Sequence, residues 1–517
     1  MFDIGEKKLW SMIKKYIDNQ LTGAGEVTGV KGNAETNYRA GTVNLTPANI
    51  GSYSKSESDT QHNALSEEIT TLGYMVGINA KGVYGVSVDY DTATFTRLGD
   101  AVGLTAGANF DNVTPFMRKR CIVTNNGTIL AYYGDEGYTE TGALEQAITI
   151  DETTYAVGTP VQVMVYQPKF YYKVIPVQLE KNTDSNIGYH LVKANYYVSG
   201  EKKDGFKVHP VFLDKNGNEA DYVLLGAFEA SMYDVSASAY VNDDTDTATA
   251  IETGDLLCSV GANKKPISGL YKNLTKANAE LMAQNRGTDW HMETIQASMV
   301  DILLYMIEYA SLDSQTAIGQ GVVSITDNSS YNCASLTGST VGNGSGNAAS
   351  TISEIGSTQT TQTANGKVSV AYRGKENDWG NIWKHINGIN IWGNGMMAGG
   401  QAYVCSDFAF NESKNSGNYK ATGITAMTAS NYIKYFGYNE EFDWLFIGSK
   451  GDTNANSIVK DYHYITSNLN GYRIALLGGS WDYGGYAGAL YWGLRSGVGY
   501  RYRAVGARLF YIKTQSV

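Results

Sequence analysis

The sequence predicts an α+β protein built from several domains, and three observations support this class. The chain has 517 residues, well above the ~100–200 that are typical of one domain. Short β-branched and aromatic runs alternate with Gly and Asn turns along much of its length, and it contains 58 Gly but only 7 Pro. Three other segments carry apolar residues at helical spacing.

The first helical segment spans residues 6–21. Its apolar positions recur at steps of three and four and are Leu9, Trp10, Ile13, Tyr16 and Ile17. A short helix at a chain terminus is marginal on its own. We therefore expect an attachment helix that docks on a partner or on sister chains, with packing on its own domain as the alternative.

The next residues are rich in Gly, Thr and Asn and lack the apolar side chains for a core of their own. The stretches Val30–Glu35, Tyr38–Arg39 and Val43–Gly51 resemble a segment common near the start of phage tail-fibre and tail-tip proteins. The resemblance covers about 25 residues. It implies that residues 1–65 form an N-terminal virion-attachment helix and a fibre-like linker.

Residues 66–189 show the pattern of a β-rich module. Asn126-Gly127 is a strong tight-turn signal between the apolar runs Cys121–Val123 and Ile129–Tyr133. Val161–Val165 is another β-rich run. The phrases Thr96–Ala101, Asn109–Asn112 and Pro168–Tyr172 resemble a module of phage tail proteins from gut bacteria. The resemblance implies a tail connector with no chemistry of its own.

Two helices and a polar insertion are expected after residue 190. One helix runs from an N-cap at Thr275 to Asn285, and Gly287 stops it. The other spans about 291–310 and carries a stripe of core residues. Residues 327–367 are rich in Ser, Thr, Asn and Gly, which predicts a surface insertion.

The C-terminal part carries a distinctive frame. Gly478-Gly479-Ser480-Trp481 is followed some 25 residues later by Val505–Leu509, and an upstream run spans 371–390. Together they resemble the C-type-lectin-like fold shared by formylglycine-generating enzymes and the variable proteins of diversity-generating retroelements. The resemblance covers roughly 190–517, which we expect to be a ligand-binding domain with a variable region at about 477–508.

The two branches of that fold differ in chemistry. The oxidase branch needs reactive cysteines after the Gly-Gly-Ser-Trp block, whereas residues 482–504 contain none. We therefore expect no enzyme and favour the binding branch, in which the frame stays fixed while the positions between its parts vary.

By matching positions, the resemblance implies eleven outward-facing ligand-binding residues. They are Asp482, Tyr483, Gly485, Tyr486, Gly493, Arg495, Ser496, Gly499, Tyr500, Tyr502 and Ala504. Trp481, Tyr491, Trp492 and Leu494 would be buried anchors, and Arg501 and Arg503 would belong to the frame. The mixture of Tyr, Gly, Ser, Asp and Arg is typical of an adaptable binding surface. A tyrosine-rich hairpin that only packs is the alternative.

Several classes of function are disfavoured by composition. The net charge of −11 disfavours nucleic acid and anionic lipid as partners. No apolar stretch reaches the ~18 residues of a membrane span. The four cysteines, Cys121, Cys258, Cys333 and Cys405, are isolated, so we expect free thiols from a reducing cytoplasm, with one late disulfide as the alternative.

We expect no metal and no cofactor. The six histidines are scattered and form no catalytic or zinc-binding motif. The acidic residues Asp243, Asp244 and Asp246 lack the glycine and the distal glutamate of a calcium loop, and Asp214–Asn218 has its glycine misplaced. Structural calcium stays open, because some C-type lectin folds carry it.

The sequence thus predicts a phage tail-tip or tail-fibre receptor-binding protein that attaches the virion to a host cell-surface protein or glycan. The resemblance also implies a homotrimer, and the N-terminus would join other tail proteins. No signal peptide is evident at the start, so we expect synthesis in the host cytoplasm and release within the virion. The alternatives are a bacterial surface adhesin of the same fold and a glycan-cleaving tailspike.

Overall fold

The computed structural model describes ten parts of the chain, nearly all within one unit, Met75–Val517. They are residues 60, 77–78, 80–242, 254–268, 274–325, 334–351, 362–395, 399–411, 418–452 and 457–515. The expected attachment helix at 6–21 and the fibre-like segment at 30–51 lie outside the described residues. So does the acidic cluster Asp243, Asp244 and Asp246.

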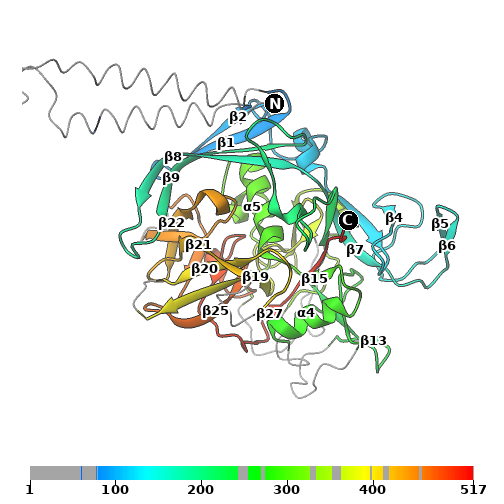
Figure 1. Ribbon diagram of the computed structural model, residues 1–517. Coiled ribbons are helices and arrows are strands. Elements are labelled where there is room, and N and C mark those ends of the chain that lie inside the picture. The colour runs from blue at the N-terminus through cyan, green and yellow to red at the C-terminus, as the bar shows by residue number, and fades with distance from the viewer. Residues whose placement is uncertain are drawn as a thin grey trace, which may run out of the picture. The chain divides into compact units, whose positions relative to one another are not determined.

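The largest sheet in the described part has fourteen strands. Ten follow one path, in the order β10 (Lys207–Val208), β8 (Tyr171–Lys181), β9 (Tyr189–Ser199), β22 (Asn431–Tyr438), β24 (Tyr462–Tyr464), β26 (Trp492–Gly493), β25 (Asn470–Leu477), β19 (Trp383–Asn394), β20 (Gln401–Cys405) and β21 (Tyr419–Thr425). Four pair beside the path, namely β1 (Val83–Asp89), β2 (Thr94–Gly99), β23 (Gly448–Asp452) and β27 (Val505–Gly506). The long β8–β9 hairpin passes over the centre of the unit (Figure 1).

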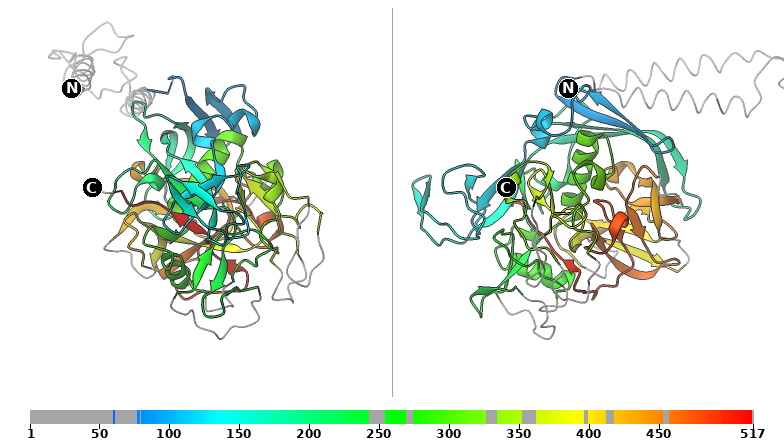
Figure 2. Two further views of the ribbon diagram at one scale, coloured as in Figure 1. Left: turned by 90° about the vertical axis from the view of Figure 1, so that its right-hand side faces the viewer. Right: turned by 180° about the vertical axis from the view of Figure 1, so that it is seen from behind.

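A second sheet carries the C-terminal strand. Its order is β15 (Trp290–Met292), β28 (Leu509–Tyr511), β11 (Tyr222–Gly226), β7 (Gln162–Pro168), β3 (Lys119–Val123) and β4 (Ile129–Tyr132). Smaller sheets join β13 (Ala239–Tyr240), β12 (Ser231–Asp234) and β14 (Leu256–Cys258); β16 (Ala348–Ala349), β17 (Val370–Tyr372) and β18 (Lys375–Glu376); and β5 (Ile148–Ile150) with β6 (Thr153–Tyr155). In Figure 2 the β5–β6 hairpin stands away from the rest of the unit.

The prediction of an α+β class is wrong, because the protein is β-rich. Strand makes up 38% of the structure and helix 12%, and the described residues hold three α-helices. Strands such as β26 and β27 have only two residues each, which is too short to show alternation in a sequence. The few helical stripes are conspicuous by comparison, so sequence reasoning gave them too much weight.

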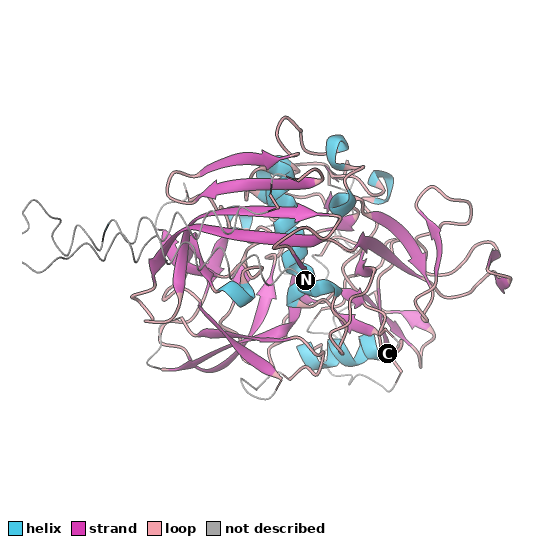
Figure 3. Cartoon of the chain, turned by 45° about the horizontal axis from the view of Figure 1, so that its top comes forward, coloured by secondary structure: helices cyan, strands magenta, loops and turns pink. Residues whose placement is uncertain are grey.

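The helix α5 (Ile295–Tyr309) lies at the centre of the unit (Figures 1 and 3). Every residue from Ile295 to Glu308 is buried, and the helix contacts β1, β9 and β19. Thr294 caps its start, because the Thr294 hydroxyl accepts the Ala297 N–H at 3.3 Å. The expected start near 291 is wrong, since Trp290–Met292 pairs with β28 as a strand.

Two further local predictions are confirmed. Helix α4 (Lys276–Gln284) begins after its N-cap Thr275, whose hydroxyl accepts the Asn278 N–H. The hairpin β3–β4 turns at Asn126-Gly127, as expected. Gly127 has φ +82°, and a Cβ there would lie 1.9 Å from the Tyr511 hydroxyl, so no larger residue fits. The third described helix, α6 (Ser314–Ala317), was not expected.

The expected connector and lectin-like parts share their sheets. Strand β9 crosses the expected boundary near residue 189 and pairs with both β8 and β22. Strand β7, before that boundary, pairs with β11, after it. The division of the chain at residues 65 and 189 stays a prediction.

A buried ionic cluster locks the C-terminal frame to the upstream run. The Lys375 ammonium contacts Glu293 at 3.1 Å, Asp378 at 3.0 Å and Asp301. Arg508, 1% exposed, donates to the carbonyls of Gly226, Glu376 and Asn377 and lies near two of the same carboxylates. The end of the chain is thereby held to residues more than a hundred positions away.

Candidate binding surface

The predicted variable region leaves β25 through a turn that only glycine allows. Gly478 has φ +99°, and a Cβ there would lie 2.8 Å from the Asp378 carbonyl oxygen. Gly479 has φ +79°, and its Cβ would lie 2.8 Å from the Ala487 methyl group. Such angles and close approaches favour glycine. After this turn the Trp481 side chain lies in the interior and is 1% exposed.

The four predicted anchors are buried. Trp481, Tyr491, Trp492 and Leu494 are each at most 2% exposed. Trp492 lies in β26 between β24 and β25, and its indole N–H donates to the Phe446 carbonyl at 3.0 Å. A buried, hydrogen-bonded indole fixes the loop on either side of it.

Nine of the eleven predicted contact residues reach solvent. Seven are exposed, namely Asp482, Gly485, Tyr486, Arg495, Gly499, Tyr500 and Tyr502. Tyr483 and Ser496 are half-buried. They come from a short helical turn, Gly484–Tyr486, and from irregular chain on both sides of β26.

Gly493 and Ala504 are corrections, because both are buried. Gly493 belongs to β26, and a Cβ there would lie 3.3 Å from Leu476 and 3.5 Å from the Trp383 ring. Ala504 is 5% exposed, packs with Trp481, and its carbonyl accepts the Trp383 N–H at 2.9 Å. Gly493 lies between the buried anchors Trp492 and Leu494. The match to the family's positions did not show that Gly493 is buried with them.

A polar-walled cavity of about 250 Å³ lies within this surface. The residues that line it are Trp383, Ser480, Trp481, Asp482, Tyr483, Arg495, Tyr500, Tyr502, Arg503 and Ala504. Tyr483 forms its aromatic wall, with ring centroids 5.5 Å from Trp383 and 5.3 Å from Tyr491. The wall is therefore positioned by two buried aromatic residues, Trp383 outside the variable region and the anchor Tyr491 within it.

A second aromatic group surrounds Tyr486. Its ring lies 4.8 Å from Tyr462 and 5.8 Å from Tyr432, and those two rings are 5.4 Å apart. Tyr432 and Tyr462 come from β22 and β24, upstream of the variable region. Sequence reasoning missed both, since only sheet pairing brings them to Tyr486 and the general excess of Tyr was the sole signal.

Arginines add positive charge to the aromatic surface. The Arg495 guanidinium lies over the Tyr464 ring, 4.0 Å from its centroid, and donates to the Tyr464 hydroxyl. The Arg503 guanidinium lies 5.9 Å from the Tyr502 ring centroid. Arg501 and Arg503 are half-buried in the loop before β27, so they are not part of the buried frame.

Tyr483 and Tyr500 keep neutral phenols across physiological pH, because the pKa of each is raised. Burial raises the pKa of Tyr483, and the charge of Asp482 adds to the effect. Burial also raises the pKa of Tyr500, against the opposing charge of Arg495. A neutral phenol both donates and accepts hydrogen bonds and offers an apolar ring face. The surface thus combines flat contact area with polar groups.

Other candidate chemistry falls elsewhere. Cys121, Cys258 and Cys405 are buried free thiols, and Cys333 lies outside the described residues. The Asp214 carboxylate accepts the N–H groups of Asn216 and Asn218, as in a turn. Within the described ranges, no three acidic, His or Cys side chains gather as metal ligands would, and no helix is both long and apolar enough to cross a membrane.

Comparisons with known proteins give little. No protein-family model and no curated protein matches the chain. A solved structure titled "Major Tropism Determinant P3c Variant" aligns at 10% identity over 79% of this chain and 73% of that chain, with a TM-score of 0.22. At such a distance the likeness carries no conclusion, so function has to be inferred from the residues of this chain.

Proposed function

We propose that this chain is a phage tail receptor-binding protein that attaches the virion to the host cell surface. Attachment is non-covalent and uses the aromatic surface of residues 480–504, without a cofactor and without catalysis. The partner is a cell-surface protein or glycan. One observation carries the proposal, namely that nine solvent-reaching residues of one short segment are mounted on a buried, tightly bonded frame.

The surface has the make-up of a binding site. Tyr and Arg are the residues that most often dominate binding energy, because they combine large rigid contact area with polar groups. Here Tyr500 and Tyr502 are 36% and 46% exposed beside Arg495 and Arg503, around a cavity. A hairpin that only packed would bury these rings.

The frame also suits a surface that varies. A Cβ added at Gly485 or Gly499 would meet no atom within 4 Å, so other side chains fit there. The same change at Gly493 would meet Leu476 and Trp383. We infer that a diversity-generating retroelement changes the exposed positions and leaves β26 constant.

Assembly into a trimer would strengthen attachment. When weak sites are linked on one fibre, binding at one site raises the effective concentration at the others. The overall avidity can then exceed the affinity of a single site by about 10²–10⁴-fold. In this proposal the N-terminal residues join the tail, and the protein acts in the virion after synthesis in the host cytoplasm. The support is the sequence resemblance of residues 30–51.

Removing two exposed rings should abolish most attachment. We expect Tyr500→Ala with Tyr502→Ala to weaken binding to susceptible cells by roughly 10²-fold or more, since aromatic hot spots contribute about 2 kcal/mol each. The measurement is a titration of labelled full-length protein on bacterial cells that the unmodified protein stains. Tyr483 is left intact, because it packs on Trp383 and its loss would disturb the frame.

A matched control separates contact from general surface effects. Tyr133 and Tyr189 are 42% and 50% exposed and lie in other parts of the chain. Their double change to Ala should leave attachment within about two-fold. Undiminished attachment by the Tyr500 and Tyr502 variant, or equal losses in both variants, would contradict the proposal.

A further inference from the structure

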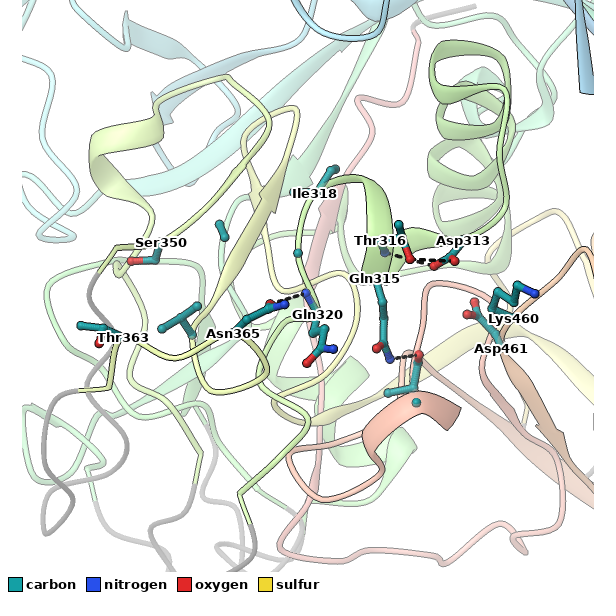
Figure 4. Close-up of a pocket in the computed structure, with 15 residues that line it drawn as sticks. Asp313, Gln315, Thr316, Ile318, Gln320, Ser350, Thr363, Asn365, Lys460 and Asp461 are labelled. Carbon is teal, nitrogen blue, oxygen red and sulfur yellow. Dashed lines mark hydrogen bonds between the residues drawn. The ribbon is translucent and has the colours of Figure 1, made fainter. Parts of the chain in front are cut away.

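A larger cavity lies beside the short helix α6, with a volume of about 710 Å³. Its walls come from residues 313–320, 349–350, 363–368, 460–461 and 485–487. Figure 4 shows Lys460 and Asp461 on one side and Ser350 and Thr363 on the other. Its volume is in the range of sites that hold small molecules.

Asp461 is the buried polar group of this cavity. Its side chain is held in place, because the carboxylate accepts the Leu490 N–H at 2.6 Å. The Gly488 backbone packs closely against it, since a Cβ on Gly488 would lie 1.8 Å from Oδ1. The residue is 2% exposed, yet it lines the cavity. A carboxyl group in such a place is either a structural acceptor or part of a binding site.

The charge state of Asp461 favours binding of a neutral group. Burial raises the pKa of Asp461 to about 8, the hydrogen bond from Leu490 opposes this, and the charge of Asp313 adds to it. At neutral pH the group is therefore mainly a protonated acid, which can donate as well as accept. The Asp313 carboxylate is already occupied, because it accepts from the Thr316 N–H at 3.0 Å and from the Thr316 hydroxyl at 2.8 Å.

Apart from the Lys460 ammonium, the rest of the lining offers neutral polar groups beside small apolar ones. Gln320 is half-buried and Thr363 is exposed, so both side chains can reach a ligand in the cavity. Asn365 accepts the Gln320 N–H through Oδ1 at 3.1 Å, which fixes its amide at the wall. Ile318 and Val368 line the same space. Paired donors and acceptors around a small apolar face match a ring that carries hydroxyl groups.

We propose that this cavity binds one neutral sugar unit of a surface glycan. The lining carries the Asp313 carboxylate and the Lys460 ammonium, so their formal charges balance and select neither an anion nor a cation. An apolar ligand would leave the polar groups unpaired, which is costly. A neutral hydroxylated ring satisfies them. This site goes beyond the proposed attachment surface and does not depend on it.

Gln315 is one of the side chains that join the cavity to the variable region. Gln315, in α6, donates through Nε2 to the Gly484 carbonyl at 2.9 Å and to that of Ala487. Gly485 and Ala487 form part of the cavity wall. A glycan held here would thus lie beside the surface that carries Tyr486.

The test titrates full-length protein with the methyl glycosides of glucose, galactose, mannose, N-acetylglucosamine and N-acetylgalactosamine. Binding is followed by saturation-transfer NMR. We expect at least one to bind saturably with millimolar affinity. Gln320→Ala with Thr363→Ala should weaken that binding by roughly ten-fold or more, because two hydrogen bonds are lost.

Matched variants make the result decisive. Gln178→Ala with Thr153→Ala changes the same residue types at exposed positions that do not line the cavity, and should bind as the parent does. The Tyr500 and Tyr502 variant should also bind normally, so failure of either proposal is distinguishable. The inference is overturned if no neutral glycoside binds, if the cavity variant binds equally well, or if methyl glucuronide binds more tightly than methyl glucoside.

Discussion

Lowering the pH from 7 to 5 is expected to lower the protein's free energy of unfolding by about 2 kcal/mol for each of three buried histidines. Burial lowers the pKa of His209, His385 and His463 to about 3 in each case. An unfolded histidine titrates near 6.5. The unfolded chain therefore binds protons that the folded chain refuses, so the penalty begins as the pH falls through 6.5 and is complete near 3.

Asp461 acts in the opposite direction. Its folded pKa of about 8 lies above the unfolded value of about 3.9. Its contribution to stability is therefore fully present below the unfolded pKa and is lost as the pH rises through 8. Burial also raises the pKa of Glu376, Asp378 and Asp443, which act in the same direction as Asp461. The net change at pH 5 is therefore smaller than the sum over the three histidines, and a single-histidine variant is the sharper test.

The variant His463→Phe isolates one histidine. Neither His463 ring nitrogen has a hydrogen-bond partner among the described residues, so replacing the imidazole by an apolar ring breaks no hydrogen bond there. Denaturant unfolding at pH 7 and pH 5 measures how much free energy of unfolding each protein loses between the two pH values. The variant should lose about 2 kcal/mol less than the parent. The neighbouring change Tyr462→Phe removes no group that titrates in this range and should show no such gain. If His463→Phe lost as much stability between pH 7 and pH 5 as the parent does, His463 would not be a source of the acid destabilisation.

Replacing Arg508 by Met is expected to lower the free energy of unfolding by about 3–5 kcal/mol. The change removes hydrogen bonds to three buried carbonyls and leaves Glu293 and Asp378 with less compensation. Even Lys would lose the planar fork that reaches all three carbonyls. Chemical denaturation measures the loss.

Arg473→Met is the matched control for that prediction. Arg473 is half-buried and donates only to the neighbouring Tyr472 carbonyl among the hydrogen bonds of the described residues. Its replacement should cost within about 0.5 kcal/mol. If Arg508→Met were as harmless, the frame would not be held by its buried ion cluster.

Local patterns in the sequence predicted local structure well. The stripe of α5, the N-cap Thr275 and the turn Asn126-Gly127 depend on neighbours along the chain, and all three are confirmed. The fold class was wrong, because two-residue strands such as β26 exist only through pairing with distant segments. Sequence spacing does not show such pairing.

The candidate surface was predictable only in part. The Gly-Gly-Ser-Trp block correctly placed its anchors inside and most intervening side chains outside. It did not show that Gly493 continues a strand, or that Tyr432 and Tyr462 join Tyr486. The cavity beside α6 draws on five separate segments, and no motif in any one of them marks it.

The most direct test of a diversified contact surface is to sequence this gene from many members of one phage population, together with its flanking DNA. The proposal predicts substitutions concentrated at the codons of the nine solvent-reaching residues, and a nearby non-coding copy that differs almost only at adenines. Gly493 and its neighbours Trp492 and Leu494 should stay constant. Invariant codons across 482–504, or substitutions falling equally on the buried residues of β26, would contradict it.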